Sequence, residues 1–159
     1  MNPFDNHAWL CERIVDHSPI GIVFADEQGM IRLWNAGAET MFGHTAAEAL
    51  GQSLDIIVPE RHRARHWEGW HQVMKTGVTK YGRDVLAVPA MRKDGQRISI
   101  EFTVTLVQNE GGSVLGAAAM IQDVTARWER DKALKARVAA LEKQVAEPGK
   151  PAAKEQTKG

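Results

Sequence analysis

Apolar and polar residues alternate between residues 98 and 106 of this 159-residue chain, within a segment that runs from 97 to 108. A period of two is the pattern of a strand that turns one face to a core and the other to solvent. We therefore predict a strand here, with its apolar side chains facing a core or a pocket. These side chains are Ile98, Ile100, Phe102, Val104 and Leu106.

Turn residues before this strand predict the rest of a sheet. Residues 26–29 end in a glycine between two apolar runs, and Lys93-Asp94-Gly95 directly precedes the long strand. Glycine supplies the positive φ that tight strand connections need. We expect an α+β fold, with a five-stranded antiparallel sheet and short helices on one of its faces. The expected strands form a hairpin over 20–35 and a meander over 85–91, 97–108 and 114–122.

Helices are expected before, within and after the sheet. Asp5 is the expected N-cap of a first helix, which ends near residue 16. Gly43 and Gly51 end two short helices, and Pro59 begins a longer one that runs to about Thr76. The predicted organisation is an N-terminal cap helix (1–17), a domain (18–125), a C-terminal helix (126–146) and a disordered tail (147–159).

The C-terminal helix carries apolar residues at the spacing of a coiled coil. Leu134, Val138, Leu141 and Val145 follow one another at steps of four, three and four positions. Arg127 and Asp131 interrupt this pattern one heptad earlier, so the seam is short. The pattern predicts a homodimer extension; the alternative is a solvated helix that packs back on its own domain.

The composition of the chain argues against several classes of function. Lysine and arginine number 20 and aspartate and glutamate also number 20, which gives no global charge for binding nucleic acid. The single Cys11 excludes an internal disulfide and an all-cysteine metal site, and it suits a reducing cytoplasm. No apolar run approaches the ~20 residues of a membrane span. We expect a cytoplasmic protein with neither a nucleic-acid nor a membrane partner.

The longer helix concentrates the residues that are able to carry chemistry. His62, His66, Trp70 and Val73 share one helical face, and an inward Trp70 would carry His66 with it. His66 is then either a core histidine or a ligand. A metal pair formed by His62 and His66 lacks an evident third ligand. No catalytic set stands out, so we expect no enzyme.

The order of these signals resembles the PAS domain family. The resemblance covers about two thirds of the chain and implies a sensor or interaction module with the PAS fold. The residues that carry it are Ser18 to Ile22, Asp26 to Gly29, Trp34-Asn35-Ala36, Phe42-Gly43, Glu48 to Gly51, Pro59-Glu60, Lys93-Asp94-Gly95 and Asp123-Val124-Thr125.

Part of the longer helix also resembles the haem-binding PAS domains of bacterial oxygen sensors. Pro59-Glu60, Arg63 and His66 match the corresponding helix of that subgroup, as does the spacing from His66 to Asp94-Gly95. The resemblance implies haem b, with His66 as the axial ligand of the iron. The implied pocket residues are His62, Trp70, Ile100, Phe102, Ala118 and Met120.

The chain departs from that subgroup on the distal side of the implied haem. Leu86 and Asp84 stand where those proteins carry an arginine or a methionine, and Arg83 falls on the other face of the strand. FAD bound without a covalent link, or no cofactor, are the alternatives. The reactive cysteine of flavin photoreceptors is absent, because Gln52-Ser53 follows Gly51.

These observations predict a cytoplasmic sensory domain in signal transduction. It would sense a gas or a redox state through haem and pass the signal through its C-terminal helix to a signalling protein in trans. The alternative is a cofactor-free interaction and dimerisation module that acts in trans on a kinase of a phosphorelay or on a transcription regulator.

Overall fold

The computed structural model describes residues 2–79, 84–147 and 149. They divide into two compact units, Met1–Thr125 and Ala126–Gly159, and each is described by itself. The helices are α1 (His7–His17), α2 (Ala36–Phe42), α3 (Ala46–Ala49), α4 (Glu60–Thr76) and α5 (Thr125–Ala146). The strands are β1 (Gly21–Asp26), β2 (Ile31–Trp34), β3 (Leu86–Met91), β4 (Arg97–Gln108) and β5 (Val114–Asp123).

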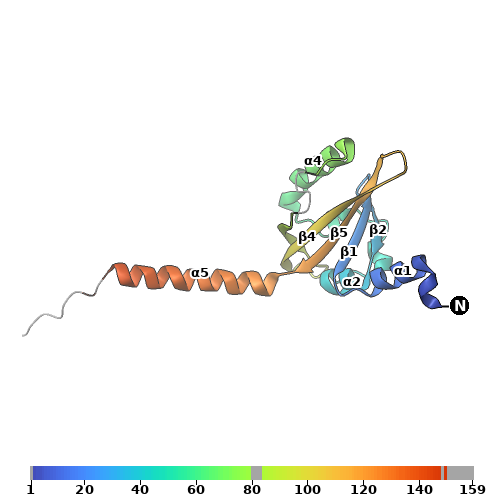
Figure 1. Ribbon diagram of the computed structural model, residues 1–159. Coiled ribbons are helices and arrows are strands. Elements are labelled where there is room, and N and C mark those ends of the chain that lie inside the picture. The colour runs from blue at the N-terminus through green and yellow to red at the C-terminus, as the bar shows by residue number, and fades with distance from the viewer. Residues whose placement is uncertain (1, 80–83, 148, 150–159) are drawn as a thin grey trace, which may run out of the picture. The chain divides into compact units, whose positions relative to one another are not determined.

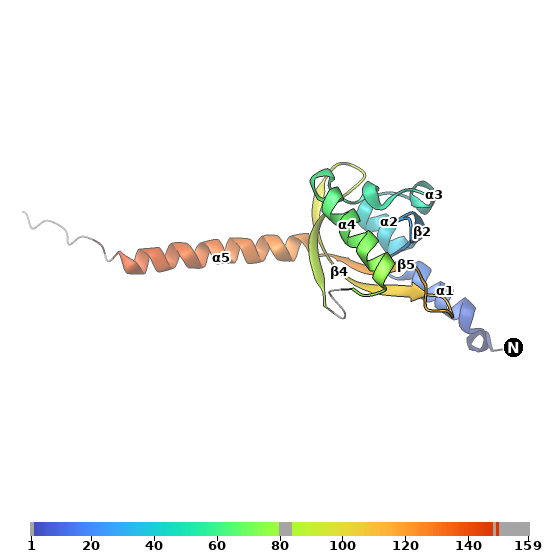
Figure 2. The same ribbon diagram turned by 90° about the horizontal axis from the view of Figure 1, so that it is seen from above.

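The first unit is a five-stranded antiparallel sheet with helices packed against one face, as the sequence predicted (Figures 1 and 2). The strand order is β2-β1-β5-β4-β3, so the two chain segments that make the hairpin and the meander meet at the β1–β5 pair. Helix α2 contacts β1, α3 contacts β2 and α4 contacts β5. The core lies between these helices and the sheet.

The strand register defines which side chains share a face. Phe102 pairs with Ile121 and Val104 pairs with Ala119, so these residues point to the same side of the sheet. We call this side the inner face, because it joins the core of the unit. Ile98 and Ile100 are buried there, whereas Phe102, Val104 and Leu106 are half-buried. The alternation predicted for residues 98–106 is therefore confirmed, and burial decreases along β4.

Two residues expected in the same pocket as Ile100 and Phe102 lie on the opposite face. Ala118 pairs with Thr105 and Met120 pairs with Thr103, and these threonines alternate with the inner residues of β4. Because side chains of a strand alternate, a shift of one position moves a residue across the sheet. The expectation that Ala118 and Met120 line the inner pocket was wrong; Ala117 and Ala119 occupy that face instead.

Asn35 is the one buried polar or charged residue among the described residues, and it is fully hydrogen-bonded. Its Nδ2 donates to the carbonyl oxygens of Val15 at 2.8 Å and Ile20 at 2.9 Å. Its Oδ1 accepts from the backbone N–H of Ile22 at 2.8 Å and of Ala38 at 3.0 Å. One amide thereby holds together the end of α1, the start of β1 and the first turn of α2.

Most helix ends agree with the sequence. Gly43 ends α2 with a φ of 81°, and Thr45 forms a capping box with Glu48 at the start of α3. The N-cap of α1 differs from the prediction, since the side chain of Asn6 accepts from the backbone of Trp9. Asp5 instead ends a preceding 3-10 turn, Pro3–Asp5.

The second unit consists of the single helix α5 over its described part. Leu134 and Leu141 are exposed along it, by 62% and 51%. Among the described residues, no helix combines the length and apolar character that crossing a membrane requires. Arg83 and most of the tail predicted over 147–159 lie outside the described residues.

We predict that Asn35→Ala lowers the free energy of unfolding by about 2–4 kcal/mol, because it removes a helix cap and leaves buried backbone groups unpaired. Denaturant unfolding followed by circular dichroism measures the change. Asn6→Ala is the matched control, since it removes an exposed cap only. Equal losses in the two variants would contradict the central role of Asn35.

Candidate functional site

Helix α4 packs against the rest of the first unit through one half-buried stripe of side chains, and none of its residues is fully buried. Pro59 stands at its N-cap, and Gly77 ends it with a φ of 67°. Arg61, Arg65 and Glu68 are exposed. The half-buried stripe consists of His62, Arg63, His66, Trp67, Trp70, Val73 and Met74. The helical face predicted for His66 and Trp70 is therefore the face that meets the rest of the unit.

Trp67 packs α4 against the β1–β2 turn. Its Nε1 donates to Oδ1 of Asp55 at 2.8 Å, and its ring covers Gly29. A Cβ at residue 29 would lie 2.2 Å from Cη2 of this ring, and Gly29 also has a φ of +77°. Glycine is thus required at this position for both space and backbone conformation.

Two polar contacts complete the attachment of α4. Trp70 donates from Nε1 to the carbonyl oxygen of Glu27, at 3.0 Å, in the same turn. Arg63 turns back and donates to the carbonyl oxygens of Val58 and Asp55, each at 3.1 Å. Helix α4 is therefore held to the β1–β2 turn and to its own preceding loop, with little burial against the strands.

His66 lies beside both tryptophans on the half-buried stripe. Its ring centroid is 4.8 Å from that of Trp67 and 6.0 Å from that of Trp70, with the second pair stacked at 29°. Its Nδ1 is buried and has no hydrogen-bond partner among the described residues. Burial lowers the pKa of His66, and the nearby charge of Asp55 raises it in part. The imidazole is accordingly neutral at pH 7.

The structure brings together some of the predicted site residues and separates others. His66, Trp70 and Phe102 lie on the inner side, and Trp70 and Phe102 pack against the core that contains Ile100. His62 lies on the same helix, where its Nε2 accepts from Nε of Arg61 at 3.1 Å. Ala118 and Met120 are absent from this group because they lie on the outer face of the sheet.

The wall opposite α4 is apolar. Leu86 pairs with Phe102 and therefore shares the inner face, whereas Asp84 is exposed before β3 begins. Asp123, which pairs with Ile100 at the end of β5, is the polar exception among the paired inner positions of the last three strands; the others are apolar, namely Val88, Ala90, Ile98, Ile100, Val104, Leu106, Ala117, Ala119 and Ile121. The departure noted on the distal side of the implied site thus leaves an apolar side chain at Leu86.

Sequence reasoning missed Trp67 and Asp55. Trp67 follows His66 directly, and its side chain belongs to the stripe that also includes Arg63 and Met74. A wider helical face, which includes the positions beside His66 and Trp70, would have identified Trp67. Asp55 gave no signal, because it lies in the 3-10 turn Leu54–Ile56, outside the helical pattern of α4.

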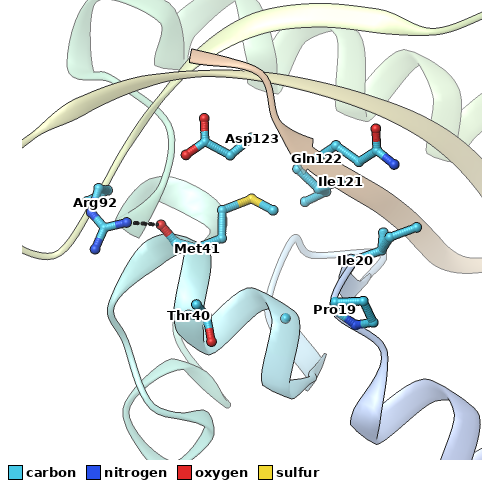
Figure 3. Close-up of a pocket in the computed structure, with 9 residues that line it drawn as sticks. Pro19, Ile20, Thr40, Met41, Arg92, Ile121, Gln122 and Asp123 are labelled. Atoms are coloured by element: carbon cyan, nitrogen blue, oxygen red, sulfur yellow. Dashed lines mark hydrogen bonds between the residues drawn. The ribbon is translucent and has the colours of Figure 1, made fainter. Parts of the chain in front are cut away.

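Two pockets of the first unit lie away from His66. One of about 530 Å³ separates α2 from the end of β5, with Arg92 at one side and Pro19 and Ile20 at the other (Figure 3). Nη1 of Arg92 donates to the carbonyl oxygen of Met41 there. A smaller one of about 350 Å³ adjoins Gly43. Within the described ranges, no cluster of three or more His, Cys, Asp or Glu residues is arranged to hold a metal ion.

Comparisons with known proteins agree with this architecture. The sensor protein FixL of Bradyrhizobium diazoefficiens is 29% identical over 96 residues, which are 58% of this chain and 18% of FixL. The oxygen sensor protein DosP of Escherichia coli is 24% identical over 97 residues, or 61% of this chain and 12% of DosP. The chain thus spans less than a fifth of the length of these relatives.

Solved structures show the same fold. A PAS domain from Colwellia psychrerythraea superposes with a TM-score of 0.65 at 23% identity, over 74% of this chain and 96% of that domain. An RNA-binding light-oxygen-voltage receptor gives 0.67 at 22% identity, over 92% of this chain and 41% of the receptor. A profile of the PAS fold matches residues 10–124. The chain therefore belongs to the PAS family.

Proposed function

We propose that this PAS domain is a sensory domain in signal transduction, without catalytic activity, that binds haem b between α4 and the inner face of the sheet. The observation that carries the proposal is the half-buried His66, whose buried Nδ1 has no hydrogen-bond partner among the described residues. The names of two relatives, a sensor protein and an oxygen sensor protein, support a sensory role.

The residues present fit a haem group in their chemistry. His66 supplies a neutral imidazole, the form in which histidine ligates iron. Phe102, Val104 and Leu106 keep half-buried apolar surface on the inner face, which suits a porphyrin. His62 on the same stripe would be available to the haem propionates. Haem held by His66 would supply an iron that binds a diatomic gas.

The competing proposal is a cofactor-free interaction module. The observation that favours it is that Trp67 and Trp70 already engage the β1–β2 turn through Asp55 and Glu27. In that case, His66 packs between the tryptophans as a structural residue. Bound FAD is the weaker alternative, since none of the described contacts specifically favours it. The two main proposals differ in whether α4 must move to admit a ligand.

Replacing His66 tests the haem proposal directly. We predict that the chain purified from cells supplied with a haem precursor shows a Soret absorption band, and that His66→Ala abolishes it. His62→Ala and His71→Ala are the matched controls on the same helix and should keep the band. Circular dichroism establishes that His66→Ala remains folded. A band unchanged in His66→Ala, or no stoichiometric band in the parent chain, would overturn the proposal.

The depressed pKa of His66 predicts a pH dependence of stability in the haem-free protein. Because the folded state lowers this pKa below its ordinary 6.5, the unfolded chain binds a proton first as pH falls. The contribution of the neutral imidazole is fully present above pH 6.5, is lost as pH falls from there through the folded pKa, and stays lost below it.

Unfolding of the haem-free parent and of His66→Gln at matched pH values measures this dependence. The parent should lose stability relative to the variant as pH falls below about 6.5. The uncharged glutamine removes the titration while keeping a polar side chain. Parallel pH profiles would show that the environment of His66 leaves its pKa unchanged.

A further inference from the structure

We propose that the pocket between α2 and the end of β5 binds a small zwitterion with an apolar side chain, which is the chemistry of a free α-amino acid. Arg92 holds its carboxylate and Asp123 holds its ammonium group. This inference goes beyond the sensory proposal and is independent of haem, because the pocket lies away from His66. It rests on the charge and polarity of the side chains that line the pocket.

The pocket has the size and the apolar walls of a small-molecule site. Its volume of about 530 Å³ falls within the usual range of ligand pockets, roughly 300–1,000 Å³. Met41 of α2 and Ile121 of β5 line it, and both belong to the buried core, which holds these walls in place. Pro19 and Ile20 line it from the segment before β1. An apolar side chain of a ligand therefore meets apolar residues from three segments.

Arg92 brings an incompletely paired cation to this pocket. Its Nη1 donates to the carbonyl oxygen of Met41 at 2.6 Å, which fixes the guanidinium at the end of α2. Its Nε is buried without a hydrogen-bond partner among the described residues, since Oδ2 of Asp94 is 3.7 Å away. The side chain as a whole is 28% exposed, so a ligand is able to reach the guanidinium. A carboxylate is the matching group, because guanidinium binds it through two parallel N–H donors.

Asp123 supplies the opposite charge from the inner face of the sheet. It pairs with Ile100 at the end of β5 and lines the same pocket. Its Oδ1 accepts from the backbone N–H and from the hydroxyl of Thr125, which leaves Oδ2 for a ligand. Within the described ranges, no ion pair joins Asp123 to Arg92. The pocket thus presents one anion and one cation that do not neutralise each other.

The arrangement of these groups selects a zwitterion over a simple anion or cation. Arg92 and Asp123 lie toward one side of the pocket, and Pro19 and Ile20 lie toward the other (Figure 3). A free amino acid has the same layout, with both charges at one end and its side chain at the other. An anion alone would meet the carboxylate of Asp123, and a cation alone would meet Arg92. Like charges at close range repel, so neither matches the pocket as well.

Three probes with one carbon skeleton test the requirement for both charges. Isothermal titration calorimetry compares leucine with isocaproate, which lacks the ammonium group, and with isoamylamine, which lacks the carboxylate. Leucine should bind, and each analogue should bind about tenfold more weakly, since each loses one charge-assisted hydrogen bond and meets a like charge. A parent chain that does not bind leucine at millimolar concentration, or that binds either analogue as tightly, would overturn the proposal.

Two variants assign each charge of the ligand to its residue. Asp123→Asn removes the charge but keeps an Oδ1 acceptor for Thr125, so this variant should bind leucine and isocaproate with equal affinity. In the same way, Arg92→Gln should erase the preference for leucine over isoamylamine. Arg97→Gln replaces an exposed arginine that does not line the pocket, and it should keep both preferences of the parent.

The variant at Arg92 also loses the contact with Met41, so circular dichroism first establishes that it is folded. If it is not, the comparison of Asp123→Asn with the parent decides the outcome. An Asp123→Asn variant that still prefers leucine over isocaproate would show that Asp123 does not bind the ammonium group, and the proposal would fail. It would fail equally if Arg97→Gln lost either preference, because leucine would then bind elsewhere.

Discussion

The amide of Asn35 is the contact on which the first unit depends. It is buried, and its donors and its acceptor reach three segments: the last turn of α1, the first residues of β1 and the start of α2. Because an unpaired buried amide is costly, these three segments hold their positions together or lose them together. The inner face of the sheet is built outward from this point, since β1 pairs with both β2 and β5.

A different kind of attachment places α4. Helix α2 contributes the buried Ala38, Met41 and Phe42, whereas α4 contributes no fully buried residue and relies on hydrogen bonds from Trp67, Trp70 and Arg63. Contacts of this kind on the edge of a helix open at lower cost than a packed core. The half-buried Phe102 and Val104 are therefore less tightly packed on the inner face than the buried Ile98 and Ile100.

The sequence predicted the structure well where the apolar residues of a segment repeat with a clear period, and poorly where they do not. Residues 98–106 alternate strongly, so the face of each of these residues in β4 was predicted correctly. Strand β5 reads Gly116-Ala117-Ala118-Ala119, whose nearly uniform small side chains carry no alternation. Only the register with β4 assigns Ala117 and Ala119 to the inner face and Ala118 to the outer one. The sequence therefore gave no physical reason to assign Ala118 to one face of the sheet rather than the other when it was chosen as a pocket residue.

The candidate site was predictable from sequence where the helical period placed a residue on the same face as a tryptophan expected to be buried. His66 followed because it shares a face with Trp70. The contact of Trp67 with Asp55 and Gly29 was not recoverable, since it joins three segments whose proximity is decided by the sheet. The lack of a hydrogen-bond partner for Nδ1 of His66 among the described residues likewise results from packing, which a sequence pattern does not encode.

The fit of Trp67 over Gly29 also constrains how this chain is able to vary. While an indole occupies position 67, no side chain larger than hydrogen is accommodated at position 29. A smaller residue at 67 would relieve the crowding and leave only the backbone requirement at 29. Substitutions at these two positions are therefore interdependent, and in the descendants of this sequence a change at 29 is expected to follow, rather than precede, a change at 67.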